Sequence, residues 1–295
     1  MAKETVGGIA KFRVQYQLVN SGSLTTIELK DSGGWLVGAS NGFSIPDSDL
    51  LSERGPRQHG GTYIEAWYRP RRCDLVVLVS ASTVSLFELR LRDLGIMFNP
   101  LNTVCRILVL TDQLGTEYSL DVRLNGPLEV RRISPVSAQA RVSLIAHDPF
   151  FKSALSLDAG TSTITTGLTI PFTIPATITS PNRFDTTIDN EGDVPTGPVI
   201  EIDGPCTNPV LANITSGKIL GVNVVVPTGG VLTIDMGLRT ITLVSGGSTS
   251  NLLGSMTGVF WELLPGTNDV SIYSQDPSNP FDTTISWIGK FLGVI

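Results

Sequence analysis

Residues 12–18 read Phe-Arg-Val-Gln-Tyr-Gln-Leu, and this stretch shows the pattern that decides the fold. Its apolar residues alternate with polar ones, at Phe12, Val14, Tyr16 and Leu18. Because successive side chains of a β-strand point to opposite faces, the alternation predicts a half-buried strand. Further strand-like stretches follow in the first half of the chain, over 24–30, 62–69, 73–80, 104–111, 117–124, 128–133 and 141–147.

One segment of the first half has a helical period instead. Its apolar residues recur every three or four positions, at Phe87, Leu91, Leu94 and Phe98. Ser85 and Glu88 stand at the spacing of a capping box, and Asn99-Pro100 ends the pattern. The first half is therefore predicted to be a small β-sandwich or barrel with one helix packed against it.

The second half shows short strands separated by turn signals such as Thr228-Gly-Gly and Gly246-Gly-Ser. We expect strands at 198–203, 209–213, 218–226, 231–235, 239–244, 258–263 and 269–273, with a last strand and tail over 282–295. Such regular spacing is typical of a sandwich or jelly roll. Residues 152–190 are interpreted as short, partly exposed strands and loops. The predicted fold class is all-β, mainly β with one helix.

Composition divides the chain near residue 150. Residues 1–150 hold 16 basic and 15 acidic residues, whereas residues 151–295 hold 5 basic and 12 acidic ones, a net charge of 5 − 12 = −7. We therefore predict a domain over 1–150 and a second over 151–295, with 152–190 as an elaborated linker or insertion. Two domains also suit a chain of 295 residues.

Several functional classes are disfavoured by the composition. A net charge of −6 argues against wrapping nucleic acid, which needs clustered Lys and Arg. No apolar run is long enough to span a membrane, and the N-terminus lacks a signal-peptide pattern. The three cysteines, Cys73, Cys105 and Cys206, lie far apart, so we expect buried, reduced thiols rather than a disulfide framework or a zinc site. No cofactor or metal site is predicted.

The stretch 35–61 is rich in Gly, Ser, Asp and Pro and is expected to be a long loop. Positive charge concentrates at Arg54 and Arg57 in this stretch and at Arg69-Pro-Arg-Arg72 after it. The candidates for subunit contacts are Arg54, Arg57, His59, Arg69, Arg71 and Arg72. Arginine favours bidentate pairing with carboxylates, so contacts between subunits are preferred here over nucleic-acid binding. His59 could act as a general base, but no nucleophile stands beside it, and no catalytic residue is nominated.

Two other groups of residues are weighed as binding sites, one for calcium and one for sugar. The carboxylates Asp185, Asp189, Glu191 and Asp193 are expected in one solvated loop, because their spacing does not fit a calcium-binding loop. Trp261 and Trp287 are candidates for an aromatic platform that would bind sugar, provided that either is exposed.

The order of several motifs resembles the siphophage distal tail protein family over nearly the whole chain. In the first half these are Arg54-Gly-Pro-Arg-Gln-His-Gly60, the capped helix and Ala146-His-Asp-Pro-Phe-Phe151. In the second half they are Gly197-Pro-Val-Ile-Glu-Ile-Asp-Gly204, residues 209–217, Leu232–Asp235 with Arg239–Leu243, and Phe260–Asn268. Residues 152–190 fit least well.

The resemblance implies a tail-tube-like N-terminal domain and a galectin-like C-terminal β-sandwich. It further implies a structural virion protein without enzyme activity, forming a homohexameric ring at the distal end of a phage tail. The ring would join the tail tube protein to the tail-tip hub protein around a channel that DNA crosses transiently, with assembly in the host cytoplasm and no membrane contact. Two alternatives stay open: a carbohydrate-binding module of the tail tip, and a cell-wall glycosidase for which no catalytic residue is nominated.

Overall fold

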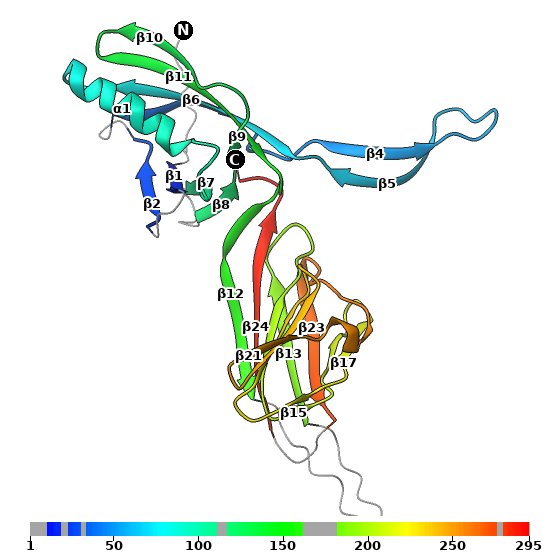
Figure 1. Ribbon diagram of the computed structural model, residues 1–295. Helices are drawn as coiled ribbons and strands as arrows, with labels where there is room; N and C mark the ends of the chain where they lie inside the picture. Colours follow the sequence, from blue (N-terminus) through cyan, green and yellow to red (C-terminus); the bar gives the residue numbers. More distant parts are fainter. Residues whose placement is uncertain are drawn as a thin grey trace, which may run out of the picture. The chain divides into compact units, whose positions relative to one another are not determined.

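The computed structural model describes residues 11–18, 23–30, 34–110, 117–161, 182–275 and 280–294. The chain forms two compact units (Figure 1). The first consists of Met1–Ser153 together with Phe291–Ile295, and the second of Ala154–Lys290. The last five residues thus group with the first unit, although the sequence placed them in the second domain.

The first unit contains two antiparallel sheets. One has the order β2-β1-β7-β8, with the start of β12 beside β8. Its strands are β1 (Lys11–Gln17), β2 (Thr25–Glu28), β7 (Val104–Leu110), β8 (Glu117–Asp121) and β12 (Phe151–Thr161). Phe12 and Val14 are buried, as the alternation at the start of the chain predicts.

The second sheet of this unit has the order β10-β11-β6-β3, with β9 paired to β11. Its strands are β3 (Trp35–Asn41), β6 (Arg71–Ser80), β9 (Arg123–Leu124), β10 (Glu129–Ser134) and β11 (Ser137–Ala146). The inward residues of β6, including Leu75 and Val77, pack in one core with Phe87 and Leu94 of the helix.

Helix α1 (Val84–Met97) lies where its period predicts, but its N-terminal cap lies two residues earlier than expected. The side chain of Thr83, not Ser85, accepts a hydrogen bond from the Leu86 backbone N–H at 3.3 Å. Glu88 instead forms an ion pair with Arg132 at 2.7 Å. The capping-box assignment was therefore wrong, because Ser85 already lies inside the helix.

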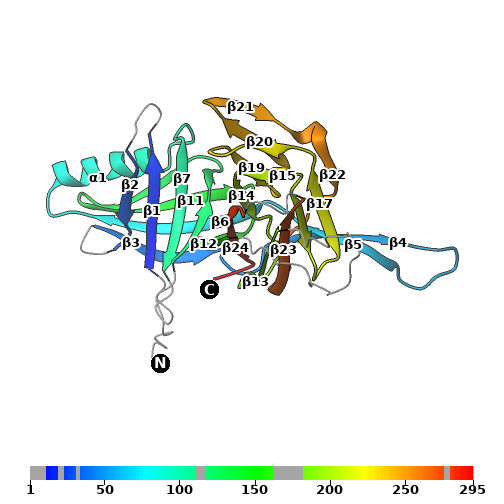
Figure 2. The ribbon, with the colours of Figure 1, turned by 90° about the horizontal axis from the view of Figure 1, so that it is seen from below.

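A two-stranded hairpin replaces most of the long loop predicted over 35–61. Besides β3, the segment contains β4 (Ser48–Glu53), which pairs with β5 (Thr62–Tyr68) and with no other strand of the described chain. Figures 1 and 2 show this hairpin extending from the sheets of the first unit. Within this segment only residues 42–47 and 54–61 lie outside strands, so the prediction of one long loop was wrong.

The second unit is a sandwich of two sheets. The first has the order β24-β14-β19-β20-β21 and the second the order β13-β23-β16-β17-β22. The first comprises β24 (Asp282–Phe291), β14 (Val199–Asp203), β19 (Val231–Asp235), β20 (Thr240–Ser245) and β21 (Ser248–Asn251). The second comprises β13 (Asn182–Asn190), β23 (Gly266–Ser274), β16 (Val210–Asn213), β17 (Lys218–Val222) and β22 (Met256–Gly258).

A small sheet of β15 (Cys206–Thr207) and β18 (Val225–Val226) and the 3-10 turn η2 (Leu253–Ser255) complete this unit. Two expectations differ. Residues 182–190 form one nine-residue strand rather than short strands and loops, because they pair with β23 along their whole length. The strand predicted over 258–263 ends at Gly258.

The prediction of an all-β fold with one helix is confirmed. Within the described ranges, no helix is long and apolar enough to cross a membrane. Most of the segment proposed as an insertion, residues 162–181, lies outside the described residues.

Candidate functional site: the β4–β5 hairpin

The hairpin is the part of the first unit whose side chains its own fold buries least. Every residue of β5 is exposed, and only one residue of β4 is even half-buried. The hairpin starts and closes at Asp47 and Arg69, where the Arg69 N–H donates to the Asp47 carbonyl at 2.8 Å. A lone two-stranded hairpin is marginally stable in water, so this one is built to contact something else.

One face of the hairpin is apolar. The pairs Leu50–Ala66 and Ser48–Tyr68 share this face, and Ser52 pairs with Tyr63 beyond a bulge at Ile64. Leu50 is 70% exposed and Tyr63 is 64% exposed. We call Leu50, Tyr63, Ile64, Ala66 and Tyr68 the apolar face. Contiguous exposed apolar side chains of this kind mark an interaction surface.

The opposite face mixes apolar and acidic residues. The register pairs Asp49 with Trp67, Leu51 with Glu65, and Glu53 with Thr62. We call Asp49, Leu51, Glu53, Glu65 and Trp67 the mixed face. Asp49 forms an ion pair with Arg69, and the hydrogen bond from that guanidinium lowers the pKa of the carboxyl. The carboxylates of Glu53 and Glu65 form no hydrogen bond or ion pair with the described parts of the chain.

The turn at the tip is held in shape by Gln58. Its side-chain oxygen accepts from the Gly55 N–H at 2.8 Å, and its amide nitrogen donates to the Thr62 hydroxyl at 3.0 Å. Arg54 Nε donates to the Gln58 carbonyl at 3.0 Å, and Arg57 adopts a φ of 62°. Gln58 thereby fixes a turn that presents Arg57 and His59 outward.

His59 therefore lies on an exposed turn. Its side chain forms no hydrogen bond or ion pair with the residues that the structure describes, and no nucleophile of the tip is oriented by it. This arrangement suits a tip that binds another surface rather than one that performs acid–base catalysis.

Arg71, at the base of the hairpin, is not available to another subunit. It is 2% exposed, and its guanidinium donates to four backbone carbonyls of its own unit: Pro149 at 2.7 Å, Gly42 at 2.9 Å, Leu292 at 2.5 Å, and Ser44. Burial lowers its pKa. The prediction of Arg71 as an interface residue is corrected: it faces inward because it shares a strand face with Cys73. Arg72 is exposed on the other face.

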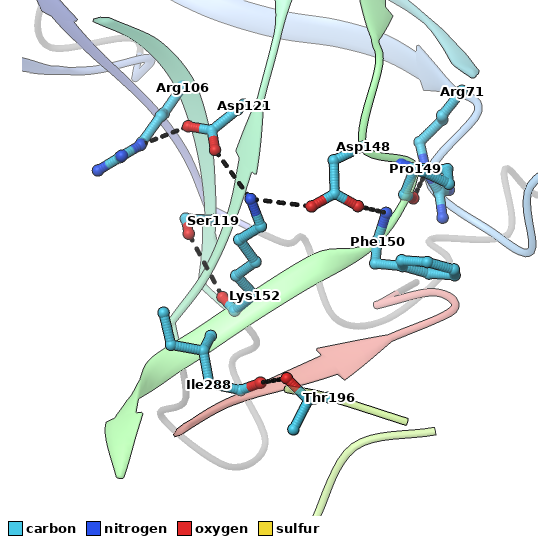
Figure 3. A network of polar contacts seen from close by, with 10 residues as sticks. All are labelled: Arg71, Arg106, Ser119, Asp121, Asp148, Pro149, Phe150, Lys152, Thr196 and Ile288. Carbon is cyan, nitrogen blue, oxygen red and sulfur yellow. Dashed lines mark hydrogen bonds and ion pairs between the residues drawn. The ribbon is translucent and has the colours of Figure 1, made fainter. Parts of the chain in front are cut away.

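A second polar network lies near the end of the first unit (Figure 3). Lys152 Nζ lies 3.1 Å from Asp121 and 3.0 Å from Asp148, and Arg106 Nε lies 2.5 Å from Asp121. Burial acts to raise the pKa of Asp121, but hydrogen bonds from Arg106 and Lys152 outweigh it and hold the pKa below its usual value. These charges satisfy one another, so the network stabilises the unit and presents no free group for chemistry.

The candidate sugar platform is not formed. Trp261 is 1% exposed and donates its Nε1 hydrogen to the Leu211 carbonyl at 3.2 Å, and Trp287 is 9% exposed. Both pack in the core of the second unit. The nomination of Trp261 and Trp287 is therefore corrected: their size places them between the sheets.

The carboxylates predicted in one loop are divided between a strand and its end. Asp185 and Asp189 lie on the exposed face of β13, and Asp185 pairs with Arg183 at 2.6 Å. Glu191 and Asp193 follow the strand. No cluster of metal-binding side chains occurs among the described residues. The three cysteines are buried and free as predicted, and burial raises the pKa of Cys73 and of Cys105 to about 11.

A family model described as the siphovirus-type tail component, C-terminal domain, matches residues 191–291, which include seven of the strands expected from the sequence. The second half of the chain therefore carries a C-terminal domain of this kind, as the resemblance to distal tail proteins implies. No curated protein matches its sequence.

Solved structures extend the likeness from this domain to the whole fold. The Dit protein of phage SPP1 is 14% identical, with a TM-score of 0.65 over 95% of this chain and 99% of that one. A chain of the phage p2 baseplate in its activated conformation with Sr is 11% identical, with a TM-score of 0.50 over 95% of this chain and 98% of that one. At these identities the likeness establishes the fold.

The C-terminal match is to a component of siphovirus-type tails, and the fold of the whole chain is that of Dit. Sequence reasoning found the basic tip, Arg54 to His59, and the strand Thr62–Tyr68 that follows it, but missed the second strand of the hairpin. That strand, Ser48–Glu53, lacks alternation and β-branched residues.

Proposed function

We propose that the protein forms a hexameric ring at the distal end of the tail, where it joins the tail tube to the tail-tip hub around the channel that DNA crosses. The subunits fold in the host cytoplasm before they enter the virion tail tip. The family match and the fold support a tail-tip role. The ring itself is our inference, and the exposed β4–β5 hairpin is the observation that carries it.

The hairpin has the properties of an arm that docks on a neighbouring subunit. Exposed apolar side chains lie on both of its faces, Leu50 and Tyr63 on one and Leu51 and Trp67 on the other. Burying a large apolar side chain contributes about 1.5–3 kcal/mol, so covering several of them supplies a substantial part of an interface. A closed ring covers such an arm in every subunit equally.

The charges of the first unit suit a channel that DNA passes without binding. Several arginines pair with carboxylates of the same unit, as Arg13 does with Glu117 at 2.9 Å and Arg141 with Asp74 at 3.6 Å. Paired guanidinium groups attract phosphate less than free ones, because their charge is already neutralised. The earlier expectation that the arginines mainly face neighbours now rests on Arg54, Arg57, Arg69 and Arg72.

We propose that this role requires no catalytic step. The carbohydrate-binding alternative loses its two nominated residues, since Trp261 and Trp287 are core residues. No observation in the described chain favours it over assembly.

Replacing residues 48–68 by a two-residue turn tests the ring. Asp47 and Arg69 are already joined by a backbone hydrogen bond, so the replacement leaves the two sheets intact. Mass photometry of the wild type should show particles of six times 31.5 kDa. The shortened protein should be a monomer with a melting temperature within about 4 °C of that of its parent, because the hairpin contributes no core side chain.

The matched point variants are Leu51→Asp on the hairpin and Leu238→Asp on an exposed turn of the second unit. The first should dissociate the ring and the second should leave it unchanged. A wild type that stays at 31.5 kDa at high concentration, or a shortened protein that still forms hexamers, contradicts the proposal.

A further inference from the structure

Helix α1 presents an unpartnered face on the side away from the core. Phe87 and Leu94 point into the core, whereas Leu89, Arg92 and Gly95 are exposed and Ile96 is half-buried. Leu89 is 54% exposed. Residues three, four and seven positions apart share one face of a helix, so Leu89, Arg92 and Ile96 form a continuous row with Gly95 beside it. We call these four residues the outer stripe.

Gly95 is not required by the fold of its own chain. A Cβ at this position would meet no atom within 4 Å, and the residue lies inside the helix, where glycine is among the least favourable residues. A glycine without an internal role suits the close approach of another backbone. The outer stripe therefore has a shallow point at Gly95 between Arg92 and Ile96.

Helix α1 and the hairpin lie at opposite sides of the first unit, as the two perpendicular views in Figures 1 and 2 show. A cyclic ring of more than two subunits joins two different surfaces of the same chain, one on each side. The hairpin supplies one of these surfaces. The second surface must then lie on the opposite side of the unit, which is the side that carries α1.

The mixed face of the hairpin matches the outer stripe in polarity and in charge. Leu51 and Trp67 are exposed apolar groups that suit Leu89 and Ile96. The carboxylates of Glu53 and Glu65 have no partner in the described parts of their chain, and the guanidinium of Arg92 likewise forms no hydrogen bond or ion pair there. Unpaired charges of opposite sign on two surfaces favour their association and set its register.

We propose that the outer stripe of α1 receives the mixed face of the hairpin from a second copy of this chain, with Glu65 pairing with Arg92 and the hairpin backbone passing over Gly95. The apolar face, on the other side of the ribbon, stays free for other contacts of the ring. This inference rests on the proposed ring and names the surface that accepts the arm.

Charge reversal tests the pairing in the full-length protein. Arg92→Glu and Glu65→Arg should each raise the concentration at which half of the hexamers dissociate by at least about tenfold, and the double variant should recover most of that loss. Glu201→Arg and Lys218→Glu, exposed positions of the second unit, are the matched controls and should leave dissociation unchanged. Mass photometry over a dilution series measures all of these.

Gly95→Gln tests the backbone approach separately. It should block hexamer formation while circular dichroism shows a melting temperature no lower than that of the wild type, since the free subunit has space for the side chain.

Hexamers of Arg92→Glu and Gly95→Gln that are as stable as the wild type would overturn the inference, and the hairpin replacement would still decide the ring. A double variant no better than the single ones would also overturn the pairing. A monomeric wild type would remove the proposed ring and this inference together.

Discussion

Arg71 shows how much one buried side chain holds together in the first unit. Its planar guanidinium binds the carbonyls of Gly42, Ser44, Pro149 and Leu292 and lies 4.7 Å from the centre of the Phe151 ring. A lysine has one ammonium group and cannot reach four carbonyls in a plane. The residue therefore connects three segments that are far apart in sequence.

Arg71→Lys should lower the free energy of unfolding by about 2–3 kcal/mol, because carbonyls that lose their donor stay buried. Chemical denaturation followed by circular dichroism measures the change. Hydrogen exchange should rise at residues 292–294, which this arginine holds. Arg72→Lys, on the exposed face of the same strand, is the control and should cost almost nothing. Equal losses for the two variants would contradict the role assigned to Arg71.

Asp121 makes the first unit sensitive to acid. Its pKa is lowered below 3.8 in the folded state, so its contribution to stability is complete above that value and is lost as the pH falls through the folded pKa. Asp121→Asn should reduce the free energy of unfolding near neutral pH by about 1 kcal/mol, and the difference from the wild type should shrink below about pH 4. Urea melts at several pH values measure this. A difference that does not depend on pH would mean that shape, not charge, is the cause.

At this scale the sequence predicts the kind of residue better than its role. Strand alternation already places Arg71 on the same face as Cys73 and Leu75, so the burial of Arg71 could have been predicted from the sequence. The carbonyls that satisfy it come from loops distant in sequence, which no local pattern contains. The burial of Trp261 depends likewise on a carbonyl in another strand, that of Leu211.

Helix α1 offers a test at the scale of one element. Thr83→Ala should lower the free energy of unfolding by about 1 kcal/mol, because the Leu86 N–H loses its acceptor at the N-terminus. Ser85→Ala should change it by only a few tenths, since Ser85 lies within the helix and alanine is the better helix former. Thermal melts of both variants measure this. A larger loss of unfolding free energy for Ser85→Ala than for Thr83→Ala would instead support Ser85 as the N-cap.

Elements with a clear period were predicted, and those without one were not. The strand at 12–17 and the helix follow from their spacing, whereas β3 and β4 are rich in Gly, Ser and Asp and bulges interrupt their registers. Nothing within β13 marks it as one long strand. Its Thr and Asp residues become strand residues because β23 lies beside them.

At the scale of the whole molecule, the ordered motifs pointed to distal tail proteins, and a family model of a siphovirus-type tail component matches residues 191–291. The hexamer, its tail partners and the role of the basic tip stay predictions. The resemblance implied a ring but not the surfaces that close it. Those surfaces, the hairpin and the outer stripe, emerge only when residues 48–68 and 84–97 are seen as parts of one folded unit.

The return of residues 291–294 to the first unit has a consequence for how this gene can change. Both ends of the described chain belong to one unit, and the other is nested between Ala154 and Lys290. Recombination at these two points could exchange or enlarge the nested unit as a cassette. The surrounding unit would keep its own sequence, so a phage lineage can diversify one module while conserving the other.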